Sequence, residues 1–369
     1  MVSNAPQSQV DFPLQESLQL STTLLASTPM DSDSRLSELA KSPPDSQQIS
    51  SLAVSWAKKY YSTVAAYNQR KQQKTSETFQ PLEFEGNRAR TVDKLADTLK
   101  VACNLAWNKV ETLLGEDIER HAISPDLINP AQIIADTRNL YRKALEAFAE
   151  QEPAARLAVL VGRELIEMRK KYSQADPLVL GFVTMQVHYV GQMLLGCLSH
   201  EERSLFVPYL KIIDDYLHIP FGNIHQAAAN HDANSKALLA VQHLLSCTTP
   251  IAHAVYERVN LQHQGYRSSS GYLNDLMVKL SGIRDVEIFQ SYLCLCALEN
   301  SVQPVQEELF PICVMLYPRL HVKWKLVQDM LMALFWEIHD RLSPEDVLIF
   351  LPYLRTLTEM FSDEIFQDS

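Results

Sequence analysis

The chain has 369 residues, of which 46% are hydrophobic and 21% are charged. This composition is typical of globular proteins and excludes a wholly disordered or fibrous chain. The formal net charge of −11 disfavours general binding to nucleic-acid phosphates, which requires clustered Lys and Arg. We therefore do not expect nucleic acid as the general partner, although this charge leaves room for a local basic patch.

Residues 1–50 are rich in Ser, Gln, Pro and Thr, and their only bases are Arg35 and Lys41. Such a segment cannot bury enough apolar surface to offset the entropy lost on ordering. We predict a disordered tail whose removal, up to about residue 48, leaves the thermal midpoint nearly unchanged. Because no base precedes Arg35 and polar residues interrupt the apolar ones, the sequence indicates no secretion signal.

The longest nearly apolar stretches, such as residues 178–187, are about half of the roughly 20 residues needed to cross a bilayer. We expect no transmembrane segment. The six cysteines are sparse and lie in apolar helical patterns, and the close pair Cys294 and Cys296 points in different directions on a helix. Their spacing and surroundings predict buried thiols that are free and bind no metal. Free thiols are typical of a reducing compartment, so we expect a cytoplasmic location.

The first helical region is predicted over residues 51–175. It opens with an amphipathic stripe that includes Trp56, Tyr60 and Tyr67, with several lysines around it. The simplest interpretation is a first helix that docks on the core. Alternatively, the three aromatic residues form an interaction surface for another protein or for a membrane interface.

Three further helix boundaries can be predicted in this region. A stripe over residues 92–113 ends before Gly115, a typical position just beyond a helix C-terminus. Asn129 and Pro130 supply an N-cap and a first-turn proline for the next helix. Pro153 is expected to begin another.

The second helical region is predicted over residues 176–369, and Asp176 with Pro177 repeats the start signal. Further helical stripes cover residues 237–245, 251–259, 288–298, 305–316 and 326–342, and no pattern indicates a β-hairpin. The expected fold is all-α, either a multi-helix bundle or an irregular array of helical hairpins.

The sequence also indicates an internal duplication. Residues 199–217 and 343–361 align without a gap, and both contain Pro-Tyr-Leu in the same place. Ser199 and Ser343 each precede a carboxylate by three residues, which predicts an N-cap at both positions. We expect residues 177–217 and 321–361 to form equivalent hairpins, each with a long helix, a tight turn and a shorter helix.

Pro208 and Pro352 lie inside the second helix of these two copies, where proline removes a backbone hydrogen bond. Each helix should therefore kink or break at its proline. Tyr209 and Tyr353, which follow these prolines, should occupy matching environments and are candidate interaction residues. Chance similarity of common helix residues is the alternative explanation.

No catalytic motif is present, because the chain lacks a phosphate-binding Gly-rich loop, GxSxG, CxxC and HExxH. We assign no catalytic residue, no metal site and no cofactor. The favoured hypothesis is a noncatalytic interaction, scaffold or regulatory protein with another protein as its partner. One alternative is a helical enzyme or cofactor-binding protein with a pocket in residues 218–253. The other is a peripheral membrane or nucleic-acid-associated factor that uses the aromatic stripe and the cluster Arg169, Lys170 and Lys171.

Overall fold

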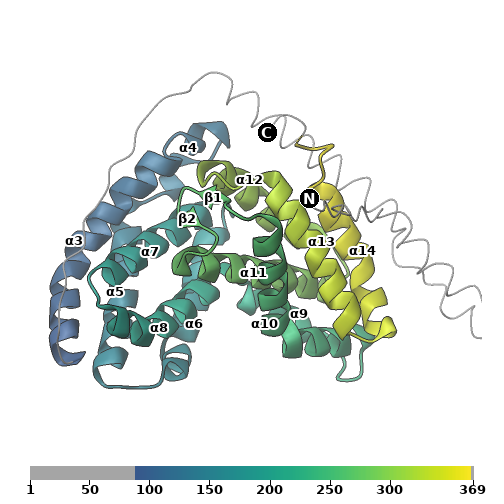
Figure 1. Cartoon of the computed structure of the whole chain (residues 1–369), viewed down its shortest axis with the longest axis horizontal. Helices are drawn as coiled ribbons and strands as arrows, with labels where there is room; N and C mark the ends of the chain where they lie inside the picture. Colours follow the sequence, from purple (N-terminus) through teal and green to yellow (C-terminus); the bar gives the residue numbers. More distant parts are fainter. Residues whose placement is uncertain (1–87, 367–369) are drawn as a thin grey trace, which may run out of the picture. The chain divides into compact units, whose positions relative to one another are not determined.

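The computed structural model describes residues 88–366. The predicted tail of residues 1–50 and the aromatic residues Trp56, Tyr60 and Tyr67 lie outside this range. Within it the all-α prediction is confirmed, because twelve α-helices account for nearly all regular structure (Figure 1).

The first half of the described residues extends to His218. Asn129 caps α5 as predicted, because its side chain accepts a 3.1 Å hydrogen bond from the backbone N–H of Gln132. Gly115 directly follows α3, also as predicted. The elements are α3 (Arg88–Leu114), α4 (Asp117–Arg120), the 3₁₀ turn η1 (Pro125–Leu127), α5 (Pro130–Ala149), α6 (Ala154–Ser173), α7 (Val179–Gly196) and α8 (His200–His218).

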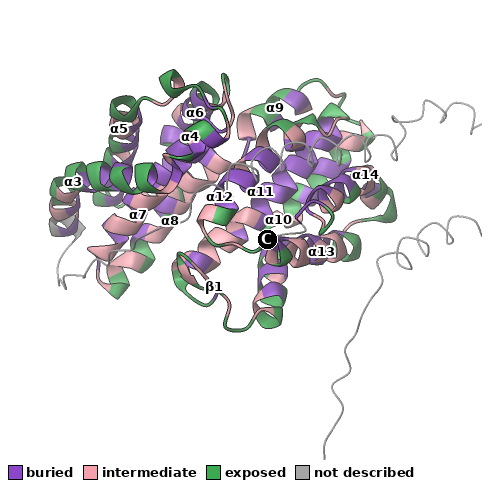
Figure 2. Ribbon diagram, turned by 90° about the horizontal axis from the view of Figure 1, so that it is seen from above, coloured by how far each residue is buried: buried purple, intermediate pink, exposed green. Residues whose placement is uncertain are grey.

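The second half follows without a long linker. Its most buried helix is α11, in which every residue from 286 to 298 is buried (Figure 2). The elements are α9 (Phe221–Ala228), α10 (Lys236–Gln262), β1 (Arg267–Ser268), β2 (Gly271–Tyr272), α11 (Leu276–Glu299), the π-helical turn η2 (Val305–Leu309), α12 (Phe310–Arg319), α13 (Trp324–Arg341) and α14 (Pro344–Met360).

Three sequence-based predictions need correction. Helix α7 begins at Val179 rather than at Pro177, because Asp176 instead accepts a 2.9 Å bond from the N–H of Leu178 in a turn. The two stripes expected over residues 237–259 form one helix, α10, which continues through Pro250. A short β-hairpin was also missed, since β1 and β2 have only two residues each and Gly271 reaches a φ of 133°.

The two halves repeat the same order of packed helices. Helix α3 packs on α5 and α7, just as α10 packs on α11 and α13. Helix α8 packs on α5 and α7, just as α14 packs on α11 and α13. The repetition therefore extends beyond the hairpins that the sequence indicated, although α6 and the broken segment η2–α12 differ in their partners.

Both predicted serine N-caps are confirmed. Ser199 begins α8 and shares a reciprocal capping box with Glu202. Ser343 begins α14 and accepts a 3.2 Å bond from the N–H of Asp346. Of the kink or break expected at the prolines, the break is absent, because α8 and α14 each continue through Pro208 or Pro352. The kink stays a prediction. The second helix is also not clearly shorter, since α7 and α8 have 18 and 19 residues and α13 and α14 have 18 and 17.

The buried apolar side chains form two clusters. One is built mainly from residues 95–217, and the other extends from residue 219 to residue 366. The first cluster also contains Met315 and Leu316 of α12, so this helix contributes to both cores. The clusters meet near residue 218, whereas the sequence suggested a regional boundary at 175/176. The domain boundaries themselves stay a prediction.

Among the described residues, α10 alone is long and apolar enough to span a membrane by length and composition. One-third (33%) of its 18-residue apolar window is buried, and the helix packs on α11, α13 and α14. Core helices of soluble proteins meet the same criterion, so α10 is weak support for a transmembrane span.

Candidate functional site

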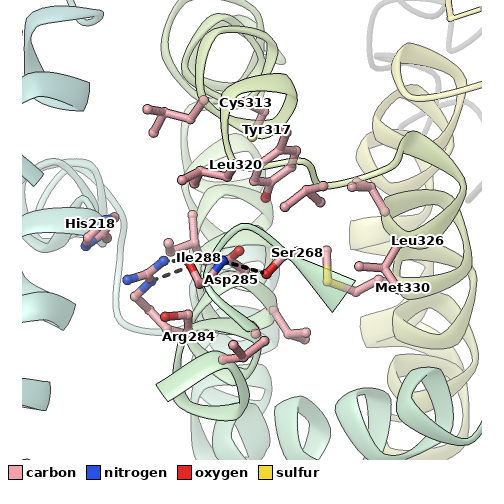
Figure 3. A pocket seen from close by; sticks show the side chains of 18 of the residues that line it. His218, Ser268, Arg284, Asp285, Ile288, Cys313, Tyr317, Leu320, Leu326 and Met330 are labelled. Carbon is pink, nitrogen blue, oxygen red and sulfur yellow. Dashed lines mark hydrogen bonds and ion pairs between the residues drawn. The ribbon is translucent and has the colours of Figure 1, made fainter. Parts of the chain in front are cut away.

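A cavity of about 170 Å³ lies between the two halves. Helix α7 contributes one wall, helices α10 to α13 contribute others, and the segment around the β-hairpin completes the lining. Figure 3 shows His218 on one side, Leu326 and Met330 on the opposite side, and Tyr317 and Leu320 between them. We call this space the interhalf cavity.

The lining of the interhalf cavity is mostly apolar. Its apolar side chains include Leu180, Met185, Val259, Ile288, Leu309, Leu316 and Val327. A mostly apolar lining favours apolar molecules, because a water molecule held against it would lack the several polar partners that it needs.

Two glycines in the lining allow helices to approach closely. A Cβ atom at Gly181 of α7 would overlap the terminal methyl group of Met315 on α12. A Cβ atom at Gly282 of α11 would likewise overlap the ring of Tyr256 on α10. The constraint is stricter at Gly282, where the neighbour is a tyrosine ring, than at Gly181, where it is the flexible end of a methionine.

A buried ion-pair network forms the polar edge of the cavity. Arg284 of α11 donates a 2.7 Å hydrogen bond to Asp214 of α8 and a 2.8 Å hydrogen bond to Asp285. The Nδ1 atom of His218 lies 2.8 Å from the carbonyl oxygen of Asp214, to which it donates. The network ties the end of α8 to the middle of α11, across the two halves.

Burial and charge shift the titration of these groups in different directions. Burial favours the neutral form of Asp214, but Arg284 and His218 outweigh it and hold its pKa below the usual range. For Asp285, burial prevails over Arg284 and raises the pKa. Burial, assisted by the positive charge of Arg284, lowers the pKa of His218 to about 3. At neutral pH the ring of His218 is therefore uncharged.

A second cavity of about 50 Å³ lies on the other side of Arg284, and both cavities share His188 and Ser281. Lys211 lines it and bridges Asp215 at 2.8 Å and Glu287 at 2.9 Å. Burial raises the pKa of Asp215 to about 6, although Lys211 opposes this effect. Ion pairs therefore join the two halves at the second cavity as well.

Two more buried clusters join the halves. Arg169 of α6 donates to the hydroxyl of Tyr292 at 3.0 Å and also pairs with Glu308. Asp117 of α4, which is fully buried, accepts a 2.8 Å bond from Arg319 of α12. The role of Asp117 in joining α4 to α12 was not predicted from the sequence.

The expected pocket in residues 218–253 is only partly reproduced. Of that segment, His218 alone lines the interhalf cavity. His231 instead bonds to Ser235 and to the carbonyl of Leu298, and His243 pairs with Asp346 at 2.8 Å. His231 and His243 are therefore held against different helices, α11 and α14.

The candidate interaction residues Tyr209 and Tyr353 are buried, with exposed fractions of 5% and 8%. The hydroxyl of Tyr209 donates to the carbonyl of Glu152, and that of Tyr353 donates to Asn300 Oδ1 at 3.0 Å. Both side chains therefore stabilise the fold instead of presenting a contact surface. The other candidates, Trp56, Tyr60 and Tyr67, lie outside the described residues.

The sequence reasoning missed Arg284, Asp214 and Asp285 as a group. A signal existed on α8, because Asp214 shares a helix face with the apolar Leu210 and Leu217. A charge on an apolar face requires a partner. That partner lies 70 residues away on α11, and a single sequence does not reveal such a long-range pair.

Within residues 88–366, no group of three or more His, Cys, Asp or Glu side chains is arranged to hold a metal ion. No family model matches the chain, and neither a curated protein nor a solved structure matches it. The interhalf cavity and its polar edge are the features from which a function can be inferred.

Proposed function

We propose that this chain is a noncatalytic regulatory protein that binds a small, neutral and largely apolar molecule in the interhalf cavity. The observation that carries this proposal is the mostly apolar space of about 170 Å³ that helices of both halves line. This proposal differs from the pocket in residues 218–253 that the sequence suggested, because the lining comes mainly from α7 and α11 to α13.

The size of the cavity defines the class of ligand. An apolar cavity of about 150 Å³ is sufficient for benzene. The interhalf cavity therefore suits a molecule with one aromatic ring or a similar hydrocarbon group. Each Å² of apolar ligand surface removed from water contributes about 25 cal/mol.

The polar edge favours a neutral ligand. Arg284 already donates to two carboxylates, so an anionic ligand would meet the negative charges of Asp214 and Asp285 at the same place. A single hydroxyl or carbonyl group facing this edge is compatible with the network. A ligand here contacts both halves, so its binding energy favours the state in which they pack together.

The test is to titrate the purified chain with benzene, phenol, indole and benzoate and to measure heats of binding and thermal midpoints. We expect the neutral probes to bind and to raise the midpoint, and benzoate to bind more weakly than phenol. Failure of all neutral probes to bind would refute the proposal.

A filled cavity provides the matched control. Ser281→Leu places a larger side chain in the lining, whereas Ser204→Leu makes the same change on the exposed surface of α8. Binding should be lost in the first variant and kept in the second. Val259→Phe is a second filling variant should Ser281→Leu not fold. Equal binding by the filled and unfilled proteins would contradict the location.

An interaction with another protein is a second proposal. Its support is three exposed leucines on two helices that pack together, Leu239 and Leu245 on α10 and Leu348 on α14. Sedimentation at rising concentration tests a second copy of the chain as the partner. Leu245→Gln with Leu348→Gln should abolish any association, and a concentration-independent monomer would exclude self-association through these leucines.

The cytoplasmic location also stays a proposal. All six cysteines are free in the structure, and four of them are buried. Free thiols are typical of a reducing compartment, which supports this placement. Fractionation of cells that express the tagged full chain would test it.

A further inference from the structure

The exposed side of α6 combines bases with apolar side chains. Val159 is 72% exposed and Leu160 is 54% exposed, the former being the most exposed large apolar side chain among the described residues. At 100° per residue, these positions fall within one arc of about 120° together with five charged residues. The charged residues of this arc are Arg156, Arg163, Glu167, Lys170 and Lys171. We call these seven residues the α6 basic face.

The α6 basic face has more basic than acidic side chains, and ion pairs within the protein do not neutralise this excess. Arg156, Arg163 and Lys170 are exposed, and Glu167 is the single acid of the arc. Lys171 is bound to Asp136 of α5 at 2.7 Å. The other acid of α6, Glu164, already pairs with Lys143 and accepts a 2.9 Å bond from Asn139. The face therefore carries a net positive charge on a chain whose formal charge is −11.

The elements beside α6 within residues 88–366 leave this face uncovered. Helix α5 contacts α6 on one flank through Glu164, and α8 contacts it on the other, where the ring of Tyr216 lies against Gly162. Helix α9 adjoins the same flank through Gly222, which lies against Ile166. The exposed residues of α9 next to it include His225 and Gln226, which add no acid. Figure 2 shows α5, α6 and α9 along one edge of the described residues.

We propose that the α6 basic face docks on an anionic lipid surface. An interfacial helix needs apolar side chains that enter the acyl boundary and Lys or Arg that meet the anionic headgroups. Val159 and Leu160 fill the first role, and Arg156, Arg163 and Lys170 fill the second. From Arg156 to Lys171 the face spans about 22 Å, which lets the helix lie along a membrane plane.

The charge pattern favours lipid over nucleic acid. Because the chain as a whole is acidic, anionic headgroups attract this face and repel the acidic parts of the surface, which orients the protein. Exposed aliphatic side chains between the bases gain energy by leaving water in a bilayer, whereas nucleic-acid backbones offer them no apolar environment. The proposal corrects the basic cluster suggested by the sequence, because Arg169 is buried and does not belong to the face.

The test uses the full chain and vesicles of phosphatidylcholine with or without 30 mol% phosphatidylserine, with binding measured by co-sedimentation. We expect binding only with phosphatidylserine, and weaker binding as the salt concentration rises. Arg156→Gln with Arg163→Gln should weaken binding by about tenfold or more, because each base near such a surface contributes about 1 kcal/mol. Val159→Ser with Leu160→Ser should also weaken it markedly, without changing the salt dependence.

Matched controls assign the binding to this face. Lys236→Gln with Arg355→Gln removes two exposed bases from the second half, and Val101→Ser with Leu105→Ser removes two exposed apolar side chains from α3. Both control variants should bind as the wild type does. Unchanged binding by the α6 variants, or tighter binding of the wild type to a 20-nucleotide DNA duplex than to the vesicles, would overturn the proposal.

Discussion

Arg284 of α11 and Asp214 of α8 form a 2.7 Å ion pair that joins the two halves of the described residues at the edge of the interhalf cavity. Their side chains are 13% and 25% exposed, so solvent compensates little for a lost partner. Replacing Arg284 leaves two carboxylates, Asp214 and Asp285, without their shared cation. The pair is therefore expected to contribute to both stability and the shape of the cavity.

We expect Arg284→Gln to lower the free energy of unfolding by about 3 kcal/mol, the lower end of the range for breaking a buried pair. Asp214→Asn should cost less, because Arg284 keeps its 2.8 Å bond to Asp285. Urea unfolding of both single variants and of the double variant measures the coupling. If the two losses simply add, the residues do not interact as the structure indicates.

Lowering the pH should destabilise the protein through His218. Burial lowers the pKa of His218 to about 3 in the folded chain, whereas an unfolded histidine has a pKa near 6.5. The unfolded chain therefore binds more protons between these values, so this contribution is fully present above about pH 6.5 and is lost as the pH falls. We expect His218 to account for a loss of about 2 kcal/mol between pH 6 and pH 4.

A comparison with His218→Asn isolates this effect, because Asn retains a side-chain donor for the carbonyl of Asp214. Asp215 has the opposite effect, since its raised pKa of about 6 makes stability fall as the pH rises through this range. The wild type should lose more stability on acidification than His218→Asn does. His225→Asn, an exposed control on α9, should follow the wild type. Parallel curves for all three proteins would contradict the prediction.

The parts of the fold that local signals specify could be predicted. Asn129, Ser199 and Ser343 each mark a helix start, because a short polar side chain before a helix satisfies free backbone N–H groups regardless of the rest of the fold. Asp176 misled the prediction because the same side chain also stabilises turns. The stripes over residues 237–245 and 251–259 were predicted separately, but tertiary packing joins them in one helix, α10, that continues through Pro250.

The candidate site could not be predicted in the same way. Its walls come from segments that are separated by more than 100 residues, such as α7 and α13. The spacing of Asp214 with Leu210 and Leu217 indicated a charge on an apolar face, but it did not identify Arg284. The equivalence of α3 and α10 depends on packing partners, and their sequences show little of it.

Cysteine reactivity should follow burial. Cys197 and Cys247 are half-buried, whereas the other four cysteines are buried. Burial raises the pKa of Cys103 to about 11 and that of Cys294 to about 12, which further reduces the reactive thiolate. We expect a thiol reagent at pH 8 to modify at most Cys197 and Cys247 rapidly in the folded protein. Mass measurement after unfolding should show six modified thiols, and a disulfide-linked species would contradict the free-cysteine structure.

The two serine N-caps should contribute similar stability. Ser199→Ala and Ser343→Ala each remove a side-chain acceptor for a first-turn N–H, and each should cost about 1 kcal/mol. Ser199→Asp and Ser343→Asp keep an acceptor and should restore most of the loss. A cost near zero at either position would show that water replaces the cap.

The buried hydroxyls of Tyr209 and Tyr353 provide the sharpest test of the repeated architecture. Each tyrosine bonds to the turn that ends a neighbouring helix, at Glu152 after α5 or at Asn300 after α11. Both turns contain a left-handed residue, Gln151 with a φ of 58° and Asn300 with a φ of 48°. In both turns the next residue donates to the carbonyl five residues earlier. The two tyrosines therefore fasten equivalent helix ends.

We expect Tyr209→Phe and Tyr353→Phe each to lower the free energy of unfolding by about 1 kcal/mol, since each removes one buried hydrogen bond and leaves the ring in place. The double variant should lose the sum, because the residues belong to separate apolar clusters. Tyr272→Phe, at a half-exposed ring in β2, is the control and should change little. If only one of the two buried tyrosine variants lowers the free energy of unfolding, the two helix ends are held by different interactions. The halves are then less alike than their helix order indicates.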